Sequence, residues 1–261
     1  MVTRTIVGIA GLIVVLSLSW LGGLPFLGLA LFAALLGGYE FYWMLRTGDF
    51  HPHTVPGLIW LALLVLGGWQ PALLPLQTVI TLGFVIILTL SLFRIERPLH
   101  SFLATSAPAL YLGIMFSQFI LMRQLEEGFW LLLLSFGIAW GNDTIAYFVG
   151  VTLGRHKIWP RLSPKKSWEG TVAGWLGAAA VAAAIVHYTP LELPLLLAAL
   201  LGLVGGILAF FGDLSISMVK RQVGVKDSGH FFPGHGGMLD RLDSMLFVIP
   251  FVYQAVILYG Q

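Results

Sequence analysis

The segment LPLLLAALLGLVGGILAFFG, residues 193–212, contains no charged side chain. A transmembrane helix needs roughly 17–25 mostly apolar residues, so this segment alone predicts one membrane-spanning helix. The whole chain has the same character, because 58% of its 261 residues are hydrophobic and only 10% are charged. A soluble domain usually carries about 25% charged residues. The composition therefore predicts an integral membrane protein and excludes a soluble enzyme, a disordered chain and a disulfide-stapled secreted domain.

Further apolar runs predict an all-α integral membrane protein, a polytopic bundle of about nine transmembrane helices. The runs do not alternate as the strands of a membrane barrel would. No small-residue cleavage site follows the first run, so we interpret it as an uncleaved helix rather than a signal peptide. The predicted spans lie near residues 5–21, 24–45, 55–70, 72–93, 99–122, 128–150, 170–189, 193–212 and 243–259.

The basic residues orient these spans, because cytoplasmic loops are enriched in Lys and Arg. With nine spans, the N-terminus and every second loop share one side, and of the 14 basic residues only Arg123 falls opposite. The sequence therefore predicts a cytoplasmic N-terminus and an outside C-terminus. We expect a multi-pass protein of the inner (cytoplasmic) membrane.

Polar residues divide the chain into two parts. Residues 1–125 are predicted to be lipid-facing scaffold helices, and residues 126–261 a catalytic region with two long cytoplasmic loops, 151–169 and 213–242.

The net charge of +2 argues against a nucleic-acid partner, and the absence of cysteine excludes thiolate sites. Glu40 stands alone in the second span, and we favour a helix-end residue that reaches the interface.

The first long loop contains SPKKSWEG, residues 163–170. Lys165 and Lys166 precede a predicted helix whose N-cap is Ser167. A helix N-terminus with free N–H groups and two lysines is a plausible phosphate cradle. The alternative is the ordinary positive charge that flanks a span on its cytoplasmic side.

The second long loop combines positive charge, glycines and carboxylates. Lys220, Arg221 and Lys226 supply fixed positive charge, and residues 233–237 (PGHGG) predict a tight turn whose amides can approach phosphate. Asp240 and Asp243 would share a helical face, with Asp213 close by. Mg²⁺ prefers one or two protein carboxylates plus substrate phosphates. The loops therefore predict a metal-assisted anion site at the cytoplasmic face.

From Ser217 to Asp243 the sequence resembles the signature of the phosphatidate cytidylyltransferases, also called CDP-diacylglycerol synthases. Further similar elements are Asn142-Asp143 with Ala146-Tyr147, and Ser163-Pro with Lys166 and Glu169-Gly170. The resemblance covers roughly residues 140–245, and the family usually has Glu where this chain has Ile216. The matching positions of the signature are Ser217, Lys220-Arg221, Lys226-Asp227, Gly229, Pro233, His235-Gly-Gly237 and Asp240-Arg-Leu-Asp243.

The resemblance implies transfer of a cytidylyl group from CTP to phosphatidate, which gives CDP-diacylglycerol and pyrophosphate. It also implies a homodimer with a cytoplasm-facing polar cavity that holds Mg²⁺, and a second cation such as K⁺ is left open. The chemistry fits the residues, because metal ions and Lys/Arg side chains neutralise charge while an ionised lipid phosphate attacks the α-phosphorus.

The site residues are assigned as hypotheses. Asp143 and Asp243 have the alternative of pairing with Arg241 or Arg221, and His235 that of a structural role in its turn. The catalytic candidates are Asp213, Lys220, Arg221, Lys226, Asp227, Asp240 and Arg241. The substrate-binding candidates are Asp143, Ser163, Lys166, Ser167, Ser217, His235, Gly236 and Gly237, and the metal candidates are Asp213, Asp240 and Asp243.

Three other functions remain as alternatives. A cytidylyltransferase for an isoprenoid-type lipid phosphate would use the same polar residues. A transporter would place charges midway through its spans, whereas here nearly every charge lies at one face. A non-catalytic paralogue finds support only in Ile216. The Asp-Gly…Ala-Arg run of a CDP-alcohol phosphotransferase is not found in the sequence.

Overall fold

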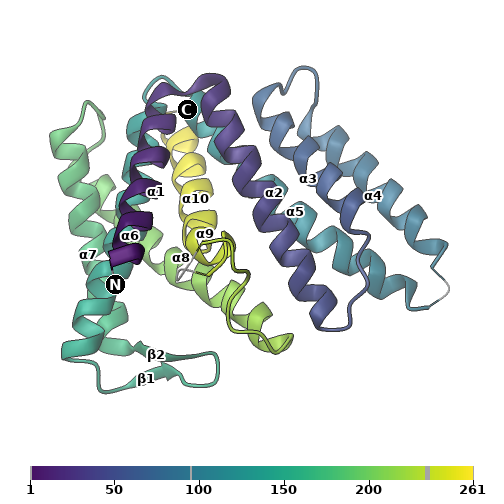
Figure 1. Ribbon diagram of the computed structural model, residues 1–261. Helices are drawn as coiled ribbons and strands as arrows, with labels where there is room; N and C mark the ends of the chain where they lie inside the picture. The colour runs from purple at the N-terminus through teal and green to yellow at the C-terminus, as the bar shows by residue number, and fades with distance from the viewer. Residues whose placement is uncertain (1, 95, 233–235, 261) are drawn as a thin grey trace. The chain divides into compact units, whose positions relative to one another are not determined.

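Every predicted span coincides with a helix. The computed structural model describes residues 2–94, 96–232 and 236–260, with side chains from residue 8 onward in the first helix. In this part of the chain the helices that match the spans are α1 (Val2–Leu21), α2 (Gly23–Thr47), α3 (Thr54–Trp69), α4 (Leu76–Leu92), α5 (Pro98–Gln124), α6 (Gly128–Thr152), α7 (Trp168–Tyr188), α8 (Leu195–Gln222) and α10 (Met245–Tyr259) (Figure 1).

Length and composition support the prediction of an all-α membrane protein. Among the described residues, five helices are long and apolar enough to cross a membrane, namely α2, α5, α6, α7 and α8. The other four apolar helices have shorter described stretches, of 10 to 17 residues. The nine-span count and the orientation of the termini stay predictions.

Both long loops contain regular structure that hydropathy did not predict. The first loop holds an antiparallel hairpin of β1 (Lys157–Trp159) and β2 (Ser163–Ser167). The second loop was predicted to begin at residue 213, but α8 continues to Gln222. The apolar run ends at Gly212, yet residues 213–222 contain neither Gly nor Pro to stop the helix. A further short helix, α9 (Leu239–Leu242), follows in the same loop.

The chain forms two compact units. Unit 1 comprises the residues up to Leu121 together with Val219–Arg241, and unit 2 comprises Met122–Met218 together with Leu242–Gln261. The end of α8 and most of the second long loop therefore belong to unit 1. The division at residue 125 into a scaffold half and a catalytic half stays a functional prediction.

Buried aromatic side chains connect the helices of unit 1, and their polar atoms donate hydrogen bonds to backbone carbonyls of neighbouring helices. Tyr42 of α2 is fully buried, and its hydroxyl donates to the carbonyl of Thr105 on α5 at 2.7 Å. Trp60 of α3 donates from Nε1 to the carbonyl of Val79 on α4 at 2.9 Å. These bonds matter in an apolar setting, because an unsatisfied polar group there is costly.

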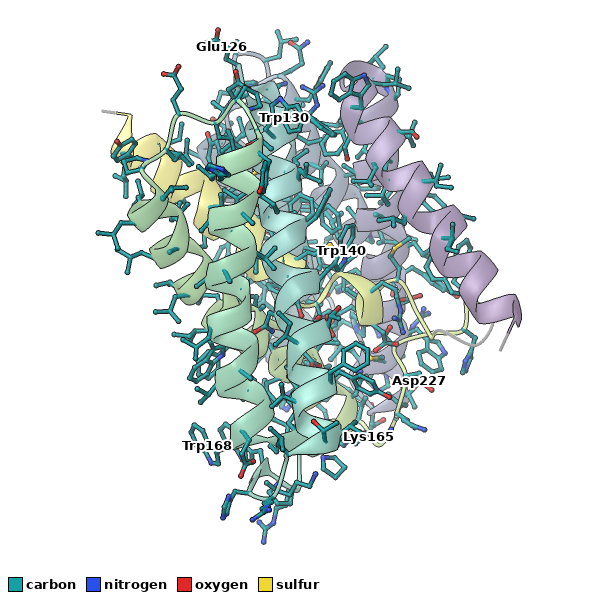
Figure 2. The ribbon with its side chains drawn as sticks, turned by 90° about the vertical axis from the view of Figure 1, so that its left-hand side faces the viewer. Glu126, Trp130, Trp140, Lys165, Trp168 and Asp227 are labelled. Carbon is teal, nitrogen blue, oxygen red and sulfur yellow. The ribbon has the colours of Figure 1, made fainter. Side chains whose placement is uncertain are left out.

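Unit 2 is built on the close pairing of α6 with α7. A Cβ on Gly174 of α7 would stand 2.9 Å from both the carbonyl and the side-chain oxygen of Asn142 on α6. Small residues allow helices to approach this closely in membranes. Figure 2 shows Glu126 and Trp130 at one end of this pair, and Lys165 and Trp168 at the other. Tryptophans at both ends fit the aromatic belts of the two membrane interfaces.

Gly174→Ala is expected to destabilise the protein by about 1–3 kcal/mol, because the added methyl overpacks the contact between α6 and α7. The thermal unfolding midpoint in detergent measures the effect. Gly28→Ala is the matched control, since a Cβ on this helical glycine meets nothing within 4 Å. Equal midpoints for the two variants would contradict the close packing.

Candidate active site

The first polar cluster lies in unit 2 and is centred on Asp213 of α8. One carboxylate oxygen of Asp213 pairs with Lys166 Nζ at 2.7 Å, and the other accepts the Ser217 hydroxyl at 3.2 Å. Lys166 also lies over the ring of Phe210, 4.5 Å from its centroid. Both partners of the ion pair are partly exposed, 23% for Lys166 and 31% for Asp213. The pair is therefore accessible to a ligand.

Two more predicted carboxylates gather in unit 2. Asp143 of α6 accepts hydrogen bonds from Asn142 Nδ2 at 3.1 Å and from the Ser244 hydroxyl at 3.4 Å. Asp243, which directly precedes Ser244 in the chain, accepts the Ser244 amide at 2.7 Å. A Cβ at Gly212 would collide with the Asp243 carbonyl, so α8 passes close to this turn just before Asp213. We call Asp143, Lys166, Asp213, Ser217 and Asp243 the Asp213 cluster.

The β1–β2 hairpin supplies Lys166 to this cluster. Ser163 begins β2 and Ser167 ends it, so Lys166 is held in extended backbone next to the start of α7. The predicted N-cap is confirmed, because the Ser167 hydroxyl accepts the Gly170 amide at 3.3 Å. Glu169 fixes the other side of the hairpin by pairing with His156 Nδ1 at 2.5 Å.

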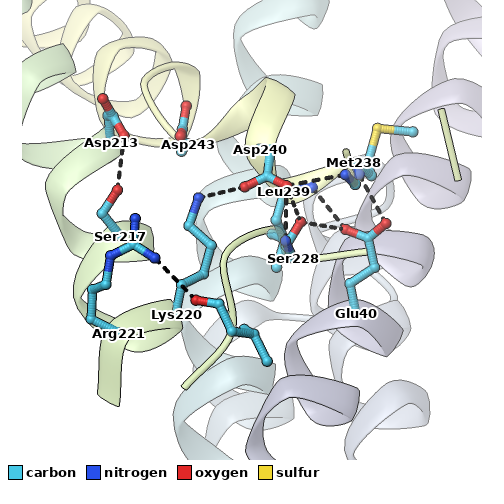
Figure 3. Close-up of polar contacts among 12 residues, drawn as sticks. Glu40, Asp213, Ser217, Lys220, Arg221, Ser228, Met238, Leu239, Asp240 and Asp243 are labelled. Carbon is cyan, nitrogen blue, oxygen red and sulfur yellow. Dashed lines mark hydrogen bonds and ion pairs between the residues drawn. The ribbon is translucent and has the colours of Figure 1, made fainter. Parts of the chain in front are cut away.

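The second polar cluster lies in unit 1 and is centred on Asp240 of α9. Asp240 Oδ1 pairs with Lys220 Nζ at 2.6 Å, and their side chains are only 10% and 11% exposed. Asp240 Oδ2 accepts three more bonds, from the Ser228 amide at 2.8 Å, the Ser228 hydroxyl at 3.0 Å and the Gly237 amide at 3.1 Å (Figure 3). We call Lys220, Ser228, Gly237 and Asp240 the Asp240 cluster.

These contacts keep Asp240 ionised. Burial alone would raise its pKa, but the hydrogen bond and charge of Lys220 and the amides of Ser228 and Gly237 outweigh burial. The pKa of Asp240 is therefore below its ordinary value. A buried carboxylate that stays charged can hold a cation or orient an ammonium group at neutral pH.

The other predicted residues of the second loop surround this cluster or follow α8. Gly236 has φ +80°, and a Cβ there would come within 2.7 Å of Asp240 Oδ2, so the glycine is required by both strain and space. Arg221 donates to the Val225 carbonyl at 3.2 Å and closes the turn after α8. Lys226, Asp227 and Arg241 are exposed, and His235 lies outside the described residues.

Two residues behave differently from their sequence interpretation. Glu40 does not extend outward from its helix, because the residue is only 4% exposed and its carboxylate accepts hydrogen bonds from the second long loop. The interpretation as an outward-reaching helix-end side chain was wrong. Ile216 is 1% exposed, so the position where the resemblance expects Glu serves here as an apolar packing position.

A ready-made metal site is not present among the described residues, since no group of three or more His, Asp or Glu side chains is arranged to hold a metal ion. The donor chemistry nevertheless suits Mg²⁺, which binds carboxylates together with substrate phosphates. In each cluster a lysine ammonium stands against the central carboxylate, at Asp213 and at Asp240. Each lysine ammonium group therefore lies beside a carboxylate that could also bind a metal cation.

Comparison with known proteins decides the family. The sequence matches the cytidylyltransferase family over residues 2–259, nearly the whole chain. The chain belongs to the cytidylyltransferase family. Members of this family are enzymes that transfer a nucleotidyl group, and the carboxylates and lysines of the two clusters fall within the matched region.

Several curated members of the cytidylyltransferase family are similar along their full length. The phosphatidate cytidylyltransferase of Bacillus subtilis (strain 168) is 34% identical over 270 residues, covering 98% of each chain. Those of Staphylococcus haemolyticus (strain JCSC1435) and Staphylococcus epidermidis (strain RP62A) are 33% and 35% identical over 260 residues, covering 96% of each chain. The resemblance drawn from residues 140–245 therefore extends to the N-terminal helices.

Proposed function

We propose that this protein transfers a cytidylyl group from CTP to phosphatidate. The observation that carries the proposal is the identity of 33–35%, over nearly the full chain, with relatives named phosphatidate cytidylyltransferase. The lysine–aspartate pairs of the two clusters support it, because they are groups suited to phosphate and metal binding.

The reaction needs no serine or histidine nucleophile. An ionised phosphate oxygen of phosphatidate forms a bond to the α-phosphorus of CTP, and the bond from that phosphorus to the β-phosphate oxygen breaks. The products are CDP-diacylglycerol and pyrophosphate, which leaves with the electron pair. The main obstacle is repulsion between two anions, which positive groups relieve in the transition state.

Lys166 and Lys220 are the strongest candidates for binding phosphate. Each already lies against an acidic partner, at 2.7 Å from Asp213 and 2.6 Å from Asp240. When substrate phosphates bind, each lysine can turn toward them. Further positive charge comes from Arg221, Lys226 and Arg241, while polar contacts to the substrates are proposed for Asp143, Ser163, Ser167, Ser217, Gly236 and Gly237.

Mg²⁺ fits the carboxylates that these lysines would release. We propose Asp213 and Asp243 as protein ligands in the Asp213 cluster and Asp240 as a protein ligand in the Asp240 cluster, with Asp227 as a further acidic group of the second loop. When bound, the ion would neutralise the charge of the triphosphate and favour departure of pyrophosphate. The pKa of Asp240, already held low, keeps that carboxylate ionised for this role.

Pyrophosphate release by purified protein in detergent tests the proposed function. Release is expected only when CTP, Mg²⁺ and phosphatidate are all present. Release with an isoprenyl phosphate in place of phosphatidate would reassign the lipid substrate within the family. Absence of release with either lipid from folded protein would favour a non-catalytic paralogue.

We also propose that the phosphate-binding residues face the cytoplasm. Lys165 and Glu126 are exposed at opposite ends of unit 2, and the chain has no native cysteine. In intact cells, a membrane-impermeant maleimide is expected to label Glu126→Cys, whereas Lys165→Cys reacts only after the membrane is opened. The reverse pattern would contradict the proposed orientation.

A further inference from the structure

We infer that Glu40 is a positioning residue of the active site, which acts through Asp240. Glu40 lies in the membrane helix α2, far in sequence from the loop that carries Asp240. The residue is only 4% exposed, although an acidic side chain within a membrane helix is expensive and usually serves a function. The inference rests on the proposed function, in which Asp240 belongs to the active site. Glu40 holds the chain segments that orient Asp240.

Both carboxylate oxygens of Glu40 are used. Oε1 accepts the Met238 amide at 2.9 Å, and Oε2 accepts the Leu239 amide and the Ser228 hydroxyl, each at 3.0 Å. One side chain of α2 therefore joins two parts of the second loop, as Figure 3 shows. We call Glu40, Ser228, Met238 and Leu239 the Glu40 clamp.

The glycines beside the clamp leave room for this carboxylate. A Cβ on Gly229 would stand 2.6 Å from Glu40 Oε1, and a Cβ on Gly237 would collide with Glu40 Oε2 and the Ser228 hydroxyl. Both glycines belong to the sequence signature. Their lack of side chains is thus explained by contact with Glu40, in addition to any contact with substrate.

The clamp is linked directly to Asp240. The Ser228 hydroxyl lies 3.0 Å from Glu40 Oε2 and 3.0 Å from Asp240 Oδ2, so the two carboxylates share one donor. The Ser228 and Gly237 amides that donate to Asp240 come from the segments that Glu40 fixes. Loss of Glu40 is therefore expected to displace the groups that place Asp240 beside Lys220.

A carboxylate is required because three donors converge on two oxygens. Glutamine would present an amino group to at least one of these N–H or O–H donors, so Glu40→Gln keeps the size of the side chain but loosens the clamp. Residues that orient metal ligands, the role proposed for Asp240, typically contribute about 10- to 100-fold to metal affinity or activity. We expect a loss of this size in kcat, with little change in the KM for phosphatidate.

Two readouts test the clamp. The first is kcat for pyrophosphate release by Glu40→Gln, and the second is the rate of maleimide labelling of a cysteine at the exposed loop position His230. In the Glu40→Gln background this cysteine is expected to react severalfold faster, because the loop is less firmly held. A cysteine at Lys157, exposed on β1 in unit 2, is expected to react at an unchanged rate.

Trp60→Phe is the matched control for lost stability. It removes a buried hydrogen bond to Val79 in unit 1 without touching the clamp, so it is expected to lower the thermal midpoint with kcat and loop labelling unchanged.

Ser228→Ala removes only the shared hydrogen-bond donor, and it is the variant to use if Glu40→Gln fails to fold. Loop labelling does not depend on turnover, so an inactive wild-type protein would overturn the proposed function alone. Unchanged labelling and kcat in both Glu40→Gln and Ser228→Ala would overturn the clamp.

Discussion

Asp240→Asn is expected to lower kcat for pyrophosphate release by about 10³-fold, an effect comparable to removing a group that stabilises transition-state charge. The asparagine amide cannot replace a carboxylate that pairs with Lys220 and accepts three bonds from the loop. The asparagine side chain is also neutral, whereas Mg²⁺ prefers a negatively charged carboxylate as its protein ligand. The measurement is kcat at saturating CTP and phosphatidate.

The fold must be separated from catalysis in this variant. Asp240→Asn leaves the buried Lys220 without its charged partner, and breaking such a pair typically costs about 3–5 kcal/mol of stability. Adding Lys220→Met removes the stranded charge and is expected to restore the thermal midpoint without restoring turnover. Glu192→Gln, at an exposed acidic position, should keep normal turnover. Normal turnover in Asp240→Asn would remove Asp240 from the active site.

Lys166→Ala is expected to lower kcat/KM for CTP by about 10²-fold, because it removes a charged contact to a phosphate in the transition state. It also leaves Asp213 without the ammonium group that lies 2.7 Å away. Asp143 is the neighbouring carboxylate, so repulsion between the two acids is then less well screened. Steady-state kinetics with varied CTP measure the change.

Lys157→Ala is the matched control for Lys166→Ala. Both lysines belong to the β1–β2 hairpin, but Lys157 is exposed and its ammonium group donates to the Lys165 carbonyl at 3.3 Å. Its removal is expected to change kcat/KM by less than about twofold, as for most exposed positions. Equal losses in the two variants would show that the hairpin contributes only general positive charge, which was the alternative interpretation of Lys165 and Lys166.

The helices were predictable because the membrane leaves few structural choices. Every backbone polar group in the apolar region must be satisfied within its own segment, so a long apolar run becomes a helix. The run at residues 193–212 therefore predicted most of α8. The same criterion is silent once charged residues appear, which is why the continuation of α8 to Gln222 and the β1–β2 hairpin were missed.

The candidate site was only partly predictable for a related reason. Asp213, Lys220 and Asp240 were found because they lie in a short region of dense charge, and Ser167 because capping is a local rule. Glu40 contacts amides 198 and 199 residues away, and backbone amides leave no mark on the sequence. The available signal was a lone carboxylate within an apolar run, which by default indicates function rather than an interfacial side chain.

The identity of the attacking oxygen tests the proposed reaction most directly. Phosphatidate labelled with ¹⁸O in its phosphate group is supplied with unlabelled CTP and Mg²⁺, and the ¹⁸O content of both products is measured by mass spectrometry. Attack by the lipid phosphate on the α-phosphorus predicts CDP-diacylglycerol that retains all of the label, and pyrophosphate that carries none. Label in pyrophosphate, or pyrophosphate without a CDP-lipid product, would contradict the proposed transfer.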